Sequence, residues 1–251
     1  MSGTGAQAGA QEPIMSDSLR DQVRASGFAI VPAEEMRGHL GAVSMHDFSA
    51  FADSWNALDL DRYMADGGHY RRRRHAVFSL RDGALERLPH QPHYQSRDYN
   101  SLNGGIERWF TEVKPEIAAS PVLKSVTAAC RDVFALDPAL PYRVEMHQFR
   151  IEATPGEAGQ PTPEGMHRDG VDWVCVMLID RVNLEQGVTS IAAPDGTPLG
   201  AFTLAAPMDA VFVDDHRVMH GVTAVTPADP GRPGYRDVLV LTFKAGQASS
   251  D

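Results

Sequence analysis

The pattern of hydrophobic and polar residues changes about halfway along the chain. From residue 142 onward, apolar residues either alternate with polar ones or form short continuous runs, and segments rich in Gly and Pro separate these runs. Alternation with a period of two is typical of a strand with one buried face, and a short apolar run is typical of a strand buried on both faces. We therefore predict strands within residues 142–153, 171–179, 188–204, 209–215, 217–225 and 235–243. Asp195-Gly196 predicts a hairpin turn inside the third of these segments.

The first half of the chain has a helical pattern interrupted by extended segments. Apolar residues recur near helical spacing between residues 33 and 58, and Pro115 stands where a helix can begin. The predicted helices are 16–27, one or two within 33–58, 106–110 with Trp109 in the core, and 115–136. The predicted strands of this half are 28–32 and 71–80. Residues 1–15, rich in Gly, Ala, Gln and Ser, are expected to be disordered.

Together these elements predict a mainly β protein with flanking helices. About eight short strands separated by Gly- and Pro-containing turns are typical of a double-stranded β-helix, the jelly roll also found in cupins. The N-terminal helices would pack outside one of its sheets. A βαβ architecture is excluded because the second half has no segment with helical periodicity. We expect residues 16–251 to form one domain.

Composition narrows the choice of partner. The chain has 251 residues, 43% of them hydrophobic, and a formal net charge of −10. An acidic surface repels nucleic acids and anionic membranes, so we expect a small-molecule partner instead, and a homodimer is left open. The only cysteines are Cys130 and Cys175, and no apolar stretch approaches the roughly 20 residues of a membrane span. A disulfide scaffold is therefore not expected, and a cytoplasmic location fits.

The segment PEGMHRDGVD (163–172) carries the strongest chemical signal. His167 and Asp169 are two residues apart, so on an extended chain their side chains point to the same side. A histidine from a neighbouring strand would complete a set of two imidazoles and one carboxylate, the ligand set of non-haem Fe(II) oxygenases. His216 and His220 lie four residues apart on a later strand-like segment and face the same way. Geometry alone leaves the choice between these two histidines open.

Arg236 begins the last predicted strand. Alternation along this strand puts Asp237 on the opposite face, whereas the face of Arg236 also carries Val238, Val240 and Thr242. Arg232 is the alternative anion-binding arginine, but it lies in a turn rich in Gly and Pro, where no strand fixes the direction of a side chain. We therefore expect Arg236 to lie beside the metal site.

Three motifs carry a resemblance to a known family: PEGMHRDGVDWV, DDHRVMHGVTAVTP and GYRDVLVLTFK. They resemble the Fe(II)/2-oxoglutarate-dependent dioxygenases typified by bacterial hydroxylases of free aliphatic L-amino acids, such as isoleucine hydroxylases. The likeness runs roughly from Gly27 to Lys244.

The resemblance implies a role for each candidate. His167, Asp169 and His220 would hold Fe(II), which makes His220 rather than His216 the third ligand. Arg236 would bind the far carboxylate of the co-substrate 2-oxoglutarate. O2 would be the second co-substrate, ascorbate the reductant in assays, and succinate and CO2 the products. The implied reaction is hydroxylation of a free L-amino acid with an aliphatic or thioether side chain.

Two polar segments provide candidates for contact with this substrate. The arginines of RRRRHAVFSL (71–80) are expected at a solvated strand edge or, for one of Arg72, Arg73 and Arg74, in the pocket against a substrate carboxylate. Residues 90–105 predict a long loop, and long loops within compact domains are often functional. Its candidates are Gln95, Tyr99 and Asn100.

Other polar residues receive weaker predictions. Gln148 is a candidate for a hydrogen bond to the co-substrate. His90 and His93 are expected at the surface because no third ligand is near them in the sequence, and His147 is expected to be a paired structural residue. The residues expected as solvated carboxylates at strand ends are Asp172, Asp214 and Asp215.

Two other classes of protein share parts of this pattern. A non-catalytic β-barrel protein could keep a metal for structure or sensing, but structural sites tend to have four protein ligands and three are evident here. A zinc-dependent hydrolase or isomerase could use the same ligands but would not need Arg236. Within the oxygenases, desaturation or cyclisation is as compatible with the sequence as hydroxylation, and so is a modified amino acid or another small molecule as substrate.

Overall fold

The computed structural model describes residues 15–246. The predicted disorder of residues 1–15 lies outside the described residues, except that Met15 begins the first helix. The helices are α1 (Met15–Ser26), α2 (Ala33–Leu40), α3 (Met45–Asp53), the 3₁₀ helix η1 (Ser54–Ala57), α4 (Pro115–Ala118) and α5 (Pro121–Val133). The strands are β1 (Phe28–Val31), β2 (Asp59–Leu60), β3 (Arg71–Arg81), β4 (Ala84–Arg87), β5 (Tyr142–Ala153), β6 (Trp173–Val182), β7 (Leu184–Gln186), β8 (Thr189–Ala192), β9 (Pro198–Phe202), β10 (Ala210–Asp214), β11 (Met219–Val222), β12 (Val225–Pro227) and β13 (Gly234–Ala245).

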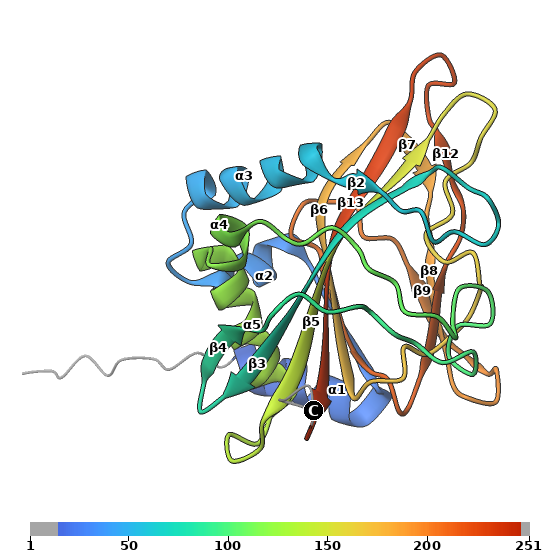
Figure 1. The fold of residues 1–251 in the computed structure, drawn as a ribbon. Coiled ribbons are helices and arrows are strands. Elements are labelled where there is room, and N and C mark those ends of the chain that lie inside the picture. The colour runs from blue at the N-terminus through green and yellow to red at the C-terminus, as the bar shows by residue number, and fades with distance from the viewer. Residues whose placement is uncertain (1–14, 247–251) are drawn as a thin grey trace, which may run out of the picture.

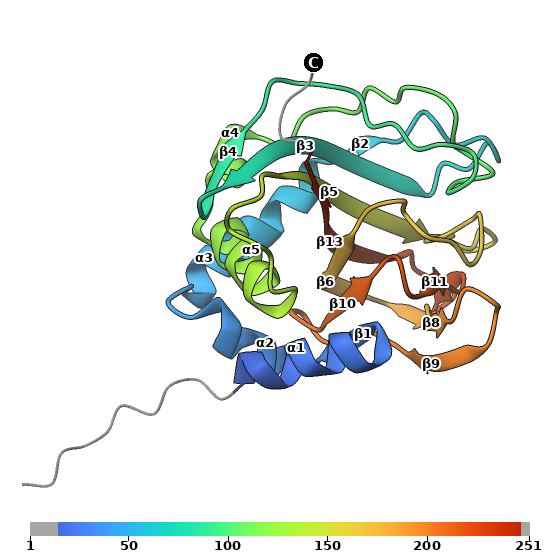
Figure 2. The same cartoon turned by 90° about the horizontal axis from the view of Figure 1, so that it is seen from below.

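The strands form one large antiparallel sheet and two small ones (Figure 1). The large sheet has the order β1-β10-β6-β13-β5-β3-β2, with β4 paired to β3. The small sheets are β11-β8-β9 and β12-β7. Figure 2 shows β11, β8 and β9 on the side of the molecule away from α3 and α5. The prediction of a mainly β jelly roll with helices packed outside it is confirmed.

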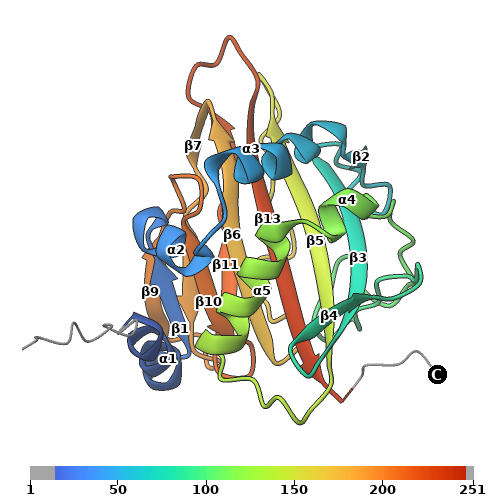
Figure 3. The ribbon, with the colours of Figure 1, turned by 90° about the vertical axis from the view of Figure 1, so that its left-hand side faces the viewer.

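Helices cover one face of the large sheet (Figure 3). The longest of them, α5, begins at Pro121, and the Ser120 side chain caps it by accepting a hydrogen bond from Leu123 N. Its apolar face packs with the strands in the main core, which includes Val126, Cys130, Phe78, Met146 and Phe243. Burial of this apolar surface stabilises the contact. The opposite face of the sheet is left for a cavity.

Strand β5 is paired over most of its length on both sides. It pairs with β13 on one side and with β3 on the other, where His147 lies opposite His75. Because side chains alternate along a strand, a slip of one residue would move every side chain to the other face. The two neighbours therefore fix which β5 side chains face the cavity.

Some sequence predictions fail in detail. Residues 106–110 form no helix but an extended segment, because Arg108 bridges to His93 of the preceding loop. Trp109, predicted in the core, is 50% exposed. The single strand predicted within residues 217–225 is divided into β11 and the start of β12. Within residues 15–246, no helix is long and apolar enough to cross a membrane.

Candidate active site

A cavity of about 510 Å³ lies on the face of the large sheet that the helices do not cover. The large sheet contributes side chains of β3, β5, β6, β10 and β13, and the small sheet contributes side chains of β8 and β11. Residues 92–96 of the predicted long loop also line the cavity, together with Tyr99 and Asn100. The structure therefore brings the predicted loop candidates Gln95, Tyr99 and Asn100 to this cavity.

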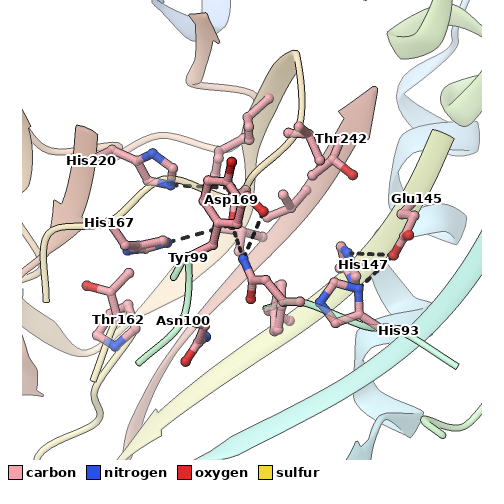
Figure 4. A pocket seen from close by; sticks show the side chains of 18 of the residues that line it. His93, Tyr99, Asn100, Glu145, His147, Thr162, His167, Asp169, His220 and Thr242 are labelled. Atoms are coloured by element: carbon pink, nitrogen blue, oxygen red, sulfur yellow. Dashed lines mark hydrogen bonds and ion pairs between the residues drawn. The ribbon is translucent and has the colours of Figure 1, made fainter. Parts of the chain in front are cut away.

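His167, Asp169 and His220 converge at one side of the cavity (Figure 4). His167 and His220 exchange two backbone hydrogen bonds of 2.9 Å, so β11 places the two imidazoles side by side. Nε2 of His167 lies 3.7 Å from Asp169 Oδ1, and Nε2 of His220 lies 3.5 Å from Asp169 Oδ2. His167 Nδ1 donates to the Gly165 carbonyl at 3.0 Å, which leaves Nε2 as the metal-binding nitrogen. Two imidazole nitrogens and a carboxylate within 4.8 Å of one another fit a divalent transition metal such as Fe(II).

The charges in this group favour a bound cation. Burial acts against ionisation of Asp169, but the interaction with His167 and the charge of His220 lower the pKa of the carboxylate below its usual range. Burial likewise opposes a charge on His167, but Asp169 raises the pKa of this imidazole to about 9. For His220, burial and the neighbouring His167 lower the pKa to about 4. A buried carboxylate that requires a positive partner is therefore present where a metal ion would bind.

Asp215 fixes the backbone that carries Asp169. Its carboxylate accepts hydrogen bonds from the N–H groups of Asp169, Gly170 and Val171 at 2.9, 2.7 and 3.1 Å. The prediction of a solvated carboxylate is wrong for Asp215, which is 2% exposed. Sequence reasoning missed this role because the contact spans 46 residues and only the fold brings the two segments together.

The loop predicted at residues 90–105 packs directly on the segment that carries Asp169. Gln95 Nε2 donates to the Asp169 carbonyl at 3.0 Å and lies 3.4 Å from its Oδ1. Gly170 has a φ of +80°, and a Cβ at this position would lie 2.6 Å from the ring of Tyr99. Glycine is thus needed at residue 170 both for its backbone conformation and for the close approach of the loop.

Arg236 also faces the cavity, from β13. It is 3% exposed, and its Nε has no hydrogen-bond partner within the described part of the chain. Burial, with a contribution from the nearby Arg181, lowers the pKa of this guanidinium to about 10. The predicted neighbours on the same face line the cavity as well: Val238, Val240 and Thr242. Asp237 points the other way, as predicted, and pairs with Arg150 at 2.6 Å.

The two rival residues lie elsewhere. Arg232 has a side chain that is 73% exposed and pairs with Asp229 at 2.9 Å in the turn before β13. His216 has a side chain that is 66% exposed and contacts Asp172 at 3.0 Å. Neither lines the cavity, so the structure places His220 with the ligand group and Arg236 with the cavity.

The arginine run of β3 divides between the two faces of the sheet. Arg71 and Arg73 line the cavity and are 6% and 3% exposed. Arg72 and Arg74 were candidates for substrate contact, but alternation directs them to the opposite face, where each pairs with a carboxylate. The prediction that this segment forms a solvated strand edge is also wrong, because β3 is paired on both sides within the sheet. Arg71 was not among the predicted candidates, although the same alternation groups it with Arg73.

Gln148, a candidate for contact with the co-substrate, does not reach the cavity. It is 1% exposed and donates to Ser54 Oγ at 2.8 Å, on the face of β5 that packs against the helices. Its neighbour His147 faces the cavity instead. The alternation of β5 was predicted correctly, but the sequence does not indicate which face the helices cover.

A second group of histidines lies across the cavity from the first. His75, His93 and His147 surround the carboxylate of Glu145, and Figure 4 shows His93, His147 and Glu145 opposite the group of Asp169. Glu145 Oε2 lies 2.9 Å from His75 Nε2 and 2.7 Å from His93 Nδ1. The prediction of a surface position is therefore wrong for His93, whose partner Glu145 is 52 residues away in the sequence.

This second group is a hydrogen-bonded network rather than a set of metal ligands. Arg73 Nη2 lies 2.7 Å from His147 Nδ1, and since a guanidinium can only donate, His147 must accept at Nδ1. A neutral His147 then carries its hydrogen on Nε2, the nitrogen that faces Glu145 at 3.8 Å and would have to bind a metal. Burial lowers the pKa of His147 well below its usual range, and the charge of Arg73 adds to this shift.

Comparison with known proteins supports the oxygenase interpretation of the first group. A family model described as 2OG-Fe dioxygenase matches residues 52–242. An L-isoleucine-4-hydroxylase from Bacillus thuringiensis is 24% identical over 156 residues, which make up 60% of this chain and 64% of that protein. A 3(1)-hydroxy-L-isoleucine 4-dioxygenase from Pantoea ananatis is 22% identical over 160 residues, 62% of this chain and 65% of that protein. The matched part thus spans less than two thirds of the length of these curated relatives.

Solved structures extend the likeness over nearly the whole chain. The crystal structure of a bsmA homolog from Methylobium petroleophilum has a TM-score of 0.83 and 33% identity, and the match covers 98% of this chain and 99% of that one. The structure of IDO from Bacillus thuringiensis has a TM-score of 0.75 with 17% identity and covers 92% of this chain and 100% of that one, which shows a shared fold. Since the family model matches well over half of the 251 residues, the chain belongs to the 2OG-Fe dioxygenase family.

Proposed function

We propose that this protein uses Fe(II), 2-oxoglutarate and O2 to hydroxylate a free L-amino acid with an aliphatic or thioether side chain, with release of succinate and CO2. His167, Asp169 and His220 would hold the metal, and Arg236 would bind the far carboxylate of 2-oxoglutarate. When bound, the metal supplies the oxygen chemistry, while the protein side chains bind and orient the reactants.

The position of Arg236 carries this proposal. A buried guanidinium that faces a cavity and lacks a carboxylate partner is stabilised when an anionic ligand binds to it. Arg236 meets this description within the described residues, and it shares its cavity with the three metal-type ligands. A structural metal site would have no use for such an arginine.

The lining of the cavity supports a substrate with an apolar side chain. Between the charged residues, the walls consist largely of aliphatic side chains: Val174, Val176, Ile191, Leu204, Val211, Val213, Val238 and Val240. The two curated relatives are named for reactions of isoleucine and hydroxy-isoleucine. Both observations support the amino acid class over a larger polar substrate.

The test is release of succinate from 2-oxoglutarate by the Fe(II)-loaded protein with ascorbate, across the proteinogenic L-amino acids, with mass spectrometry of the products. We expect succinate release to rise with at least one aliphatic or thioether amino acid, whose mass should increase by one oxygen atom. A loss of two hydrogen atoms would indicate desaturation or cyclisation. If no aliphatic or thioether amino acid stimulated release or were modified, the proposed substrate class would be wrong.

A further inference from the structure

Besides Arg236, the cavity contains three buried, charged side chains to which the proposed reaction assigns no role. Arg73 Nε, Arg108 Nε and Glu164 Oε2 are buried and have no hydrogen-bond partner within residues 15–246. Arg73 and Arg108 are 3% and 2% exposed, and the side chain of Glu164 is 9% exposed. All three residues line the cavity. Buried polar groups without partners are unfavourable, so this combination of charges indicates a ligand.

Nearby carboxylates do not neutralise the two arginines. Asp61 is fully buried and binds Arg71, with Arg71 Nε donating to Asp61 Oδ2 at 2.7 Å. Arg73 Nη1 lies 3.8 Å from the same oxygen, beyond hydrogen-bond distance. Arg108 makes no ion pair in the described part of the chain, and its contact with Gln95 Oε1 is 3.4 Å long. Three guanidiniums therefore share one close carboxylate, and an anionic group would complete the charge balance.

Arg73 is held in a fixed orientation. Its guanidinium lies 3.7 Å from the ring centre of Phe110 and 4.4 Å from that of Phe149. Its hydrogen bond to the neutral His147 fixes one edge of the guanidinium without neutralising its charge. A guanidinium oriented in this way loses little entropy when it binds a carboxylate.

Glu164 lines the same cavity as Arg73 and Arg108, and its Oε1 lies 3.7 Å from Nε2 of His167. Glu164 Oε1 also accepts a weak hydrogen bond from Asn100 Nδ2 at 3.4 Å. Five residues before Asn100, the side chain of Gln95 contacts Arg108. Asn100 N donates to the Ser96 carbonyl, so Gln95 and Asn100 belong to one compact turn. One turn of the loop thus contacts both Arg108 and the carboxylate of Glu164.

We propose that these residues form a head-group site for an α-amino acid, in which Arg73 and Arg108 bind the substrate carboxylate and Glu164 binds its ammonium group. Two positive side chains and one negative side chain in the same cavity match the charges of a zwitterionic head group. The site rests on the proposed amino acid substrate and adds that both charged groups are recognised. A 2-hydroxy acid, which lacks the ammonium, and a methyl ester, which lacks the carboxylate, should therefore bind poorly.

The experiment measures binding without turnover. L-Isoleucine, L-leucine and L-methionine, together with their 2-hydroxy acids and methyl esters, are titrated calorimetrically into protein that holds 2-oxoglutarate and Zn(II) in place of Fe(II). We expect at least one amino acid to bind about 30-fold more tightly than its 2-hydroxy acid and its ester. Glu164→Gln should reduce the preference over the 2-hydroxy acid to less than about 3-fold, and Arg73→Gln or Arg108→Gln should do the same for the preference over the ester.

Matched controls separate these effects from damage to the fold. Glu185→Gln removes an exposed carboxylate on β7, and Arg72→Gln removes an arginine on the outer face of β3, so both should keep the full preferences. Arg108→Lys keeps the charge and should retain part of the preference over the ester even if Arg108→Gln is unstable. The affinity of each variant for Zn(II) and 2-oxoglutarate should stay within about 3-fold of the parent.

The outcomes distinguish this proposal from the proposed reaction. Preferences that depend on Glu164, without succinate release from the Fe(II) protein, would support the head-group site and overturn the reaction. Succinate release with no change of preference in Glu164→Gln would support the reaction and overturn the site. Failure of all three amino acids to bind would overturn the head-group site. The site would also be overturned if the reduced preference over the 2-hydroxy acid in Glu164→Gln were explained by a loss of Zn(II) affinity.

Discussion

Two groups of histidines and carboxylates face each other across one cavity, but their chemistry differs. In the group of His167, Asp169 and His220, the Nε2 atoms face the carboxylate at 3.5 to 3.7 Å, which is too long for a hydrogen bond. In the group around Glu145, the carboxylate is bonded at 2.7 and 2.9 Å by two imidazoles and at 3.0 Å by Arg143. The first group leaves room for an ion between its ligands, whereas the carboxylate of the second is already hydrogen-bonded by its neighbours.

The number of histidines and carboxylates in a cluster does not identify a metal site. The hydrogen-bond partner of each Nδ1 atom does, because it decides whether Nε2 is free to bind a metal. His167 donates from Nδ1 to a carbonyl, which frees Nε2 for a metal, whereas His147 accepts from Arg73 at Nδ1, which puts the hydrogen on Nε2.

The largest expected effect is loss of the metal. Asp169→Ala should reduce both Fe(II) binding and succinate release by about 1,000-fold or more, because the carboxylate is the only anionic ligand. His93→Gln, in the second group, should still bind one metal per chain, measured by elemental analysis of the purified protein. A parent protein with two metals per chain, one of which is lost in His93→Gln, would contradict the distinction between the two groups.

The next effect concerns the co-substrate. Arg236→Gln should raise the KM for 2-oxoglutarate by about 100-fold, since it removes a buried charge-assisted contact. Fe(II) affinity should change little. Arg232→Gln is the matched control, because its side chain is exposed, and it should leave this KM unchanged. If the KM for 2-oxoglutarate increased only in Arg232→Gln, Arg232 rather than Arg236 would bind the co-substrate.

A smaller effect on Fe(II) affinity is expected from substitution of Asp215, which holds the backbone of Asp169 in place. Asp215→Asn replaces a carboxylate that accepts three backbone hydrogen bonds by an amide that can accept fewer and also donates. We expect Fe(II) affinity to fall by about 10-fold, as for other residues that orient metal ligands. Asp214→Asn, one residue earlier, should bind Fe(II) normally. Equal Fe(II) affinities in the two variants would show that Asp215 does not help to hold Asp169 in place.

The second group should appear in the pH dependence of stability. Burial lowers the pKa of His93 to about 4 and also lowers those of His75 and His147. The unfolded chain takes up protons near pH 6.5, so the free energy of unfolding should fall as the pH drops from about 6.5 towards 4. His93→Asn should reduce this slope by up to about 1.4 kcal/mol per pH unit, measured by urea denaturation at pH 7, 6 and 5. An unchanged slope would contradict the neutral state of His93.

The sequence predicted those features that depend on local periodicity. Alternation along β13 placed Arg236 on one face and Asp237 on the other, and the structure agrees. Alternation along β5 separated His147 from Gln148 correctly, but the choice of the cavity face was wrong for Gln148. That choice depends on which side the helices pack, and helix packing is a property of the whole fold.

Contacts between distant segments could not be predicted in the same way. Asp215 reaches Asp169 across 46 residues, and His93 reaches Glu145 across 52. The sequence shows each residue near a turn or in a loop, where a solvated side chain is the ordinary outcome. Only the paired strands determine which of these loops lie together over the cavity.

The position of Gln95 has a thermodynamic consequence. One end of its amide contacts Arg108 at 3.4 Å, and the other donates to Asp169 at 3.0 Å. A single side chain thus joins the proposed head-group site to the backbone of the proposed metal ligand Asp169. Coupling between two bound species is reciprocal, so any factor by which the amino acid tightens the hold on the metal must equal the factor by which the metal tightens the hold on the amino acid.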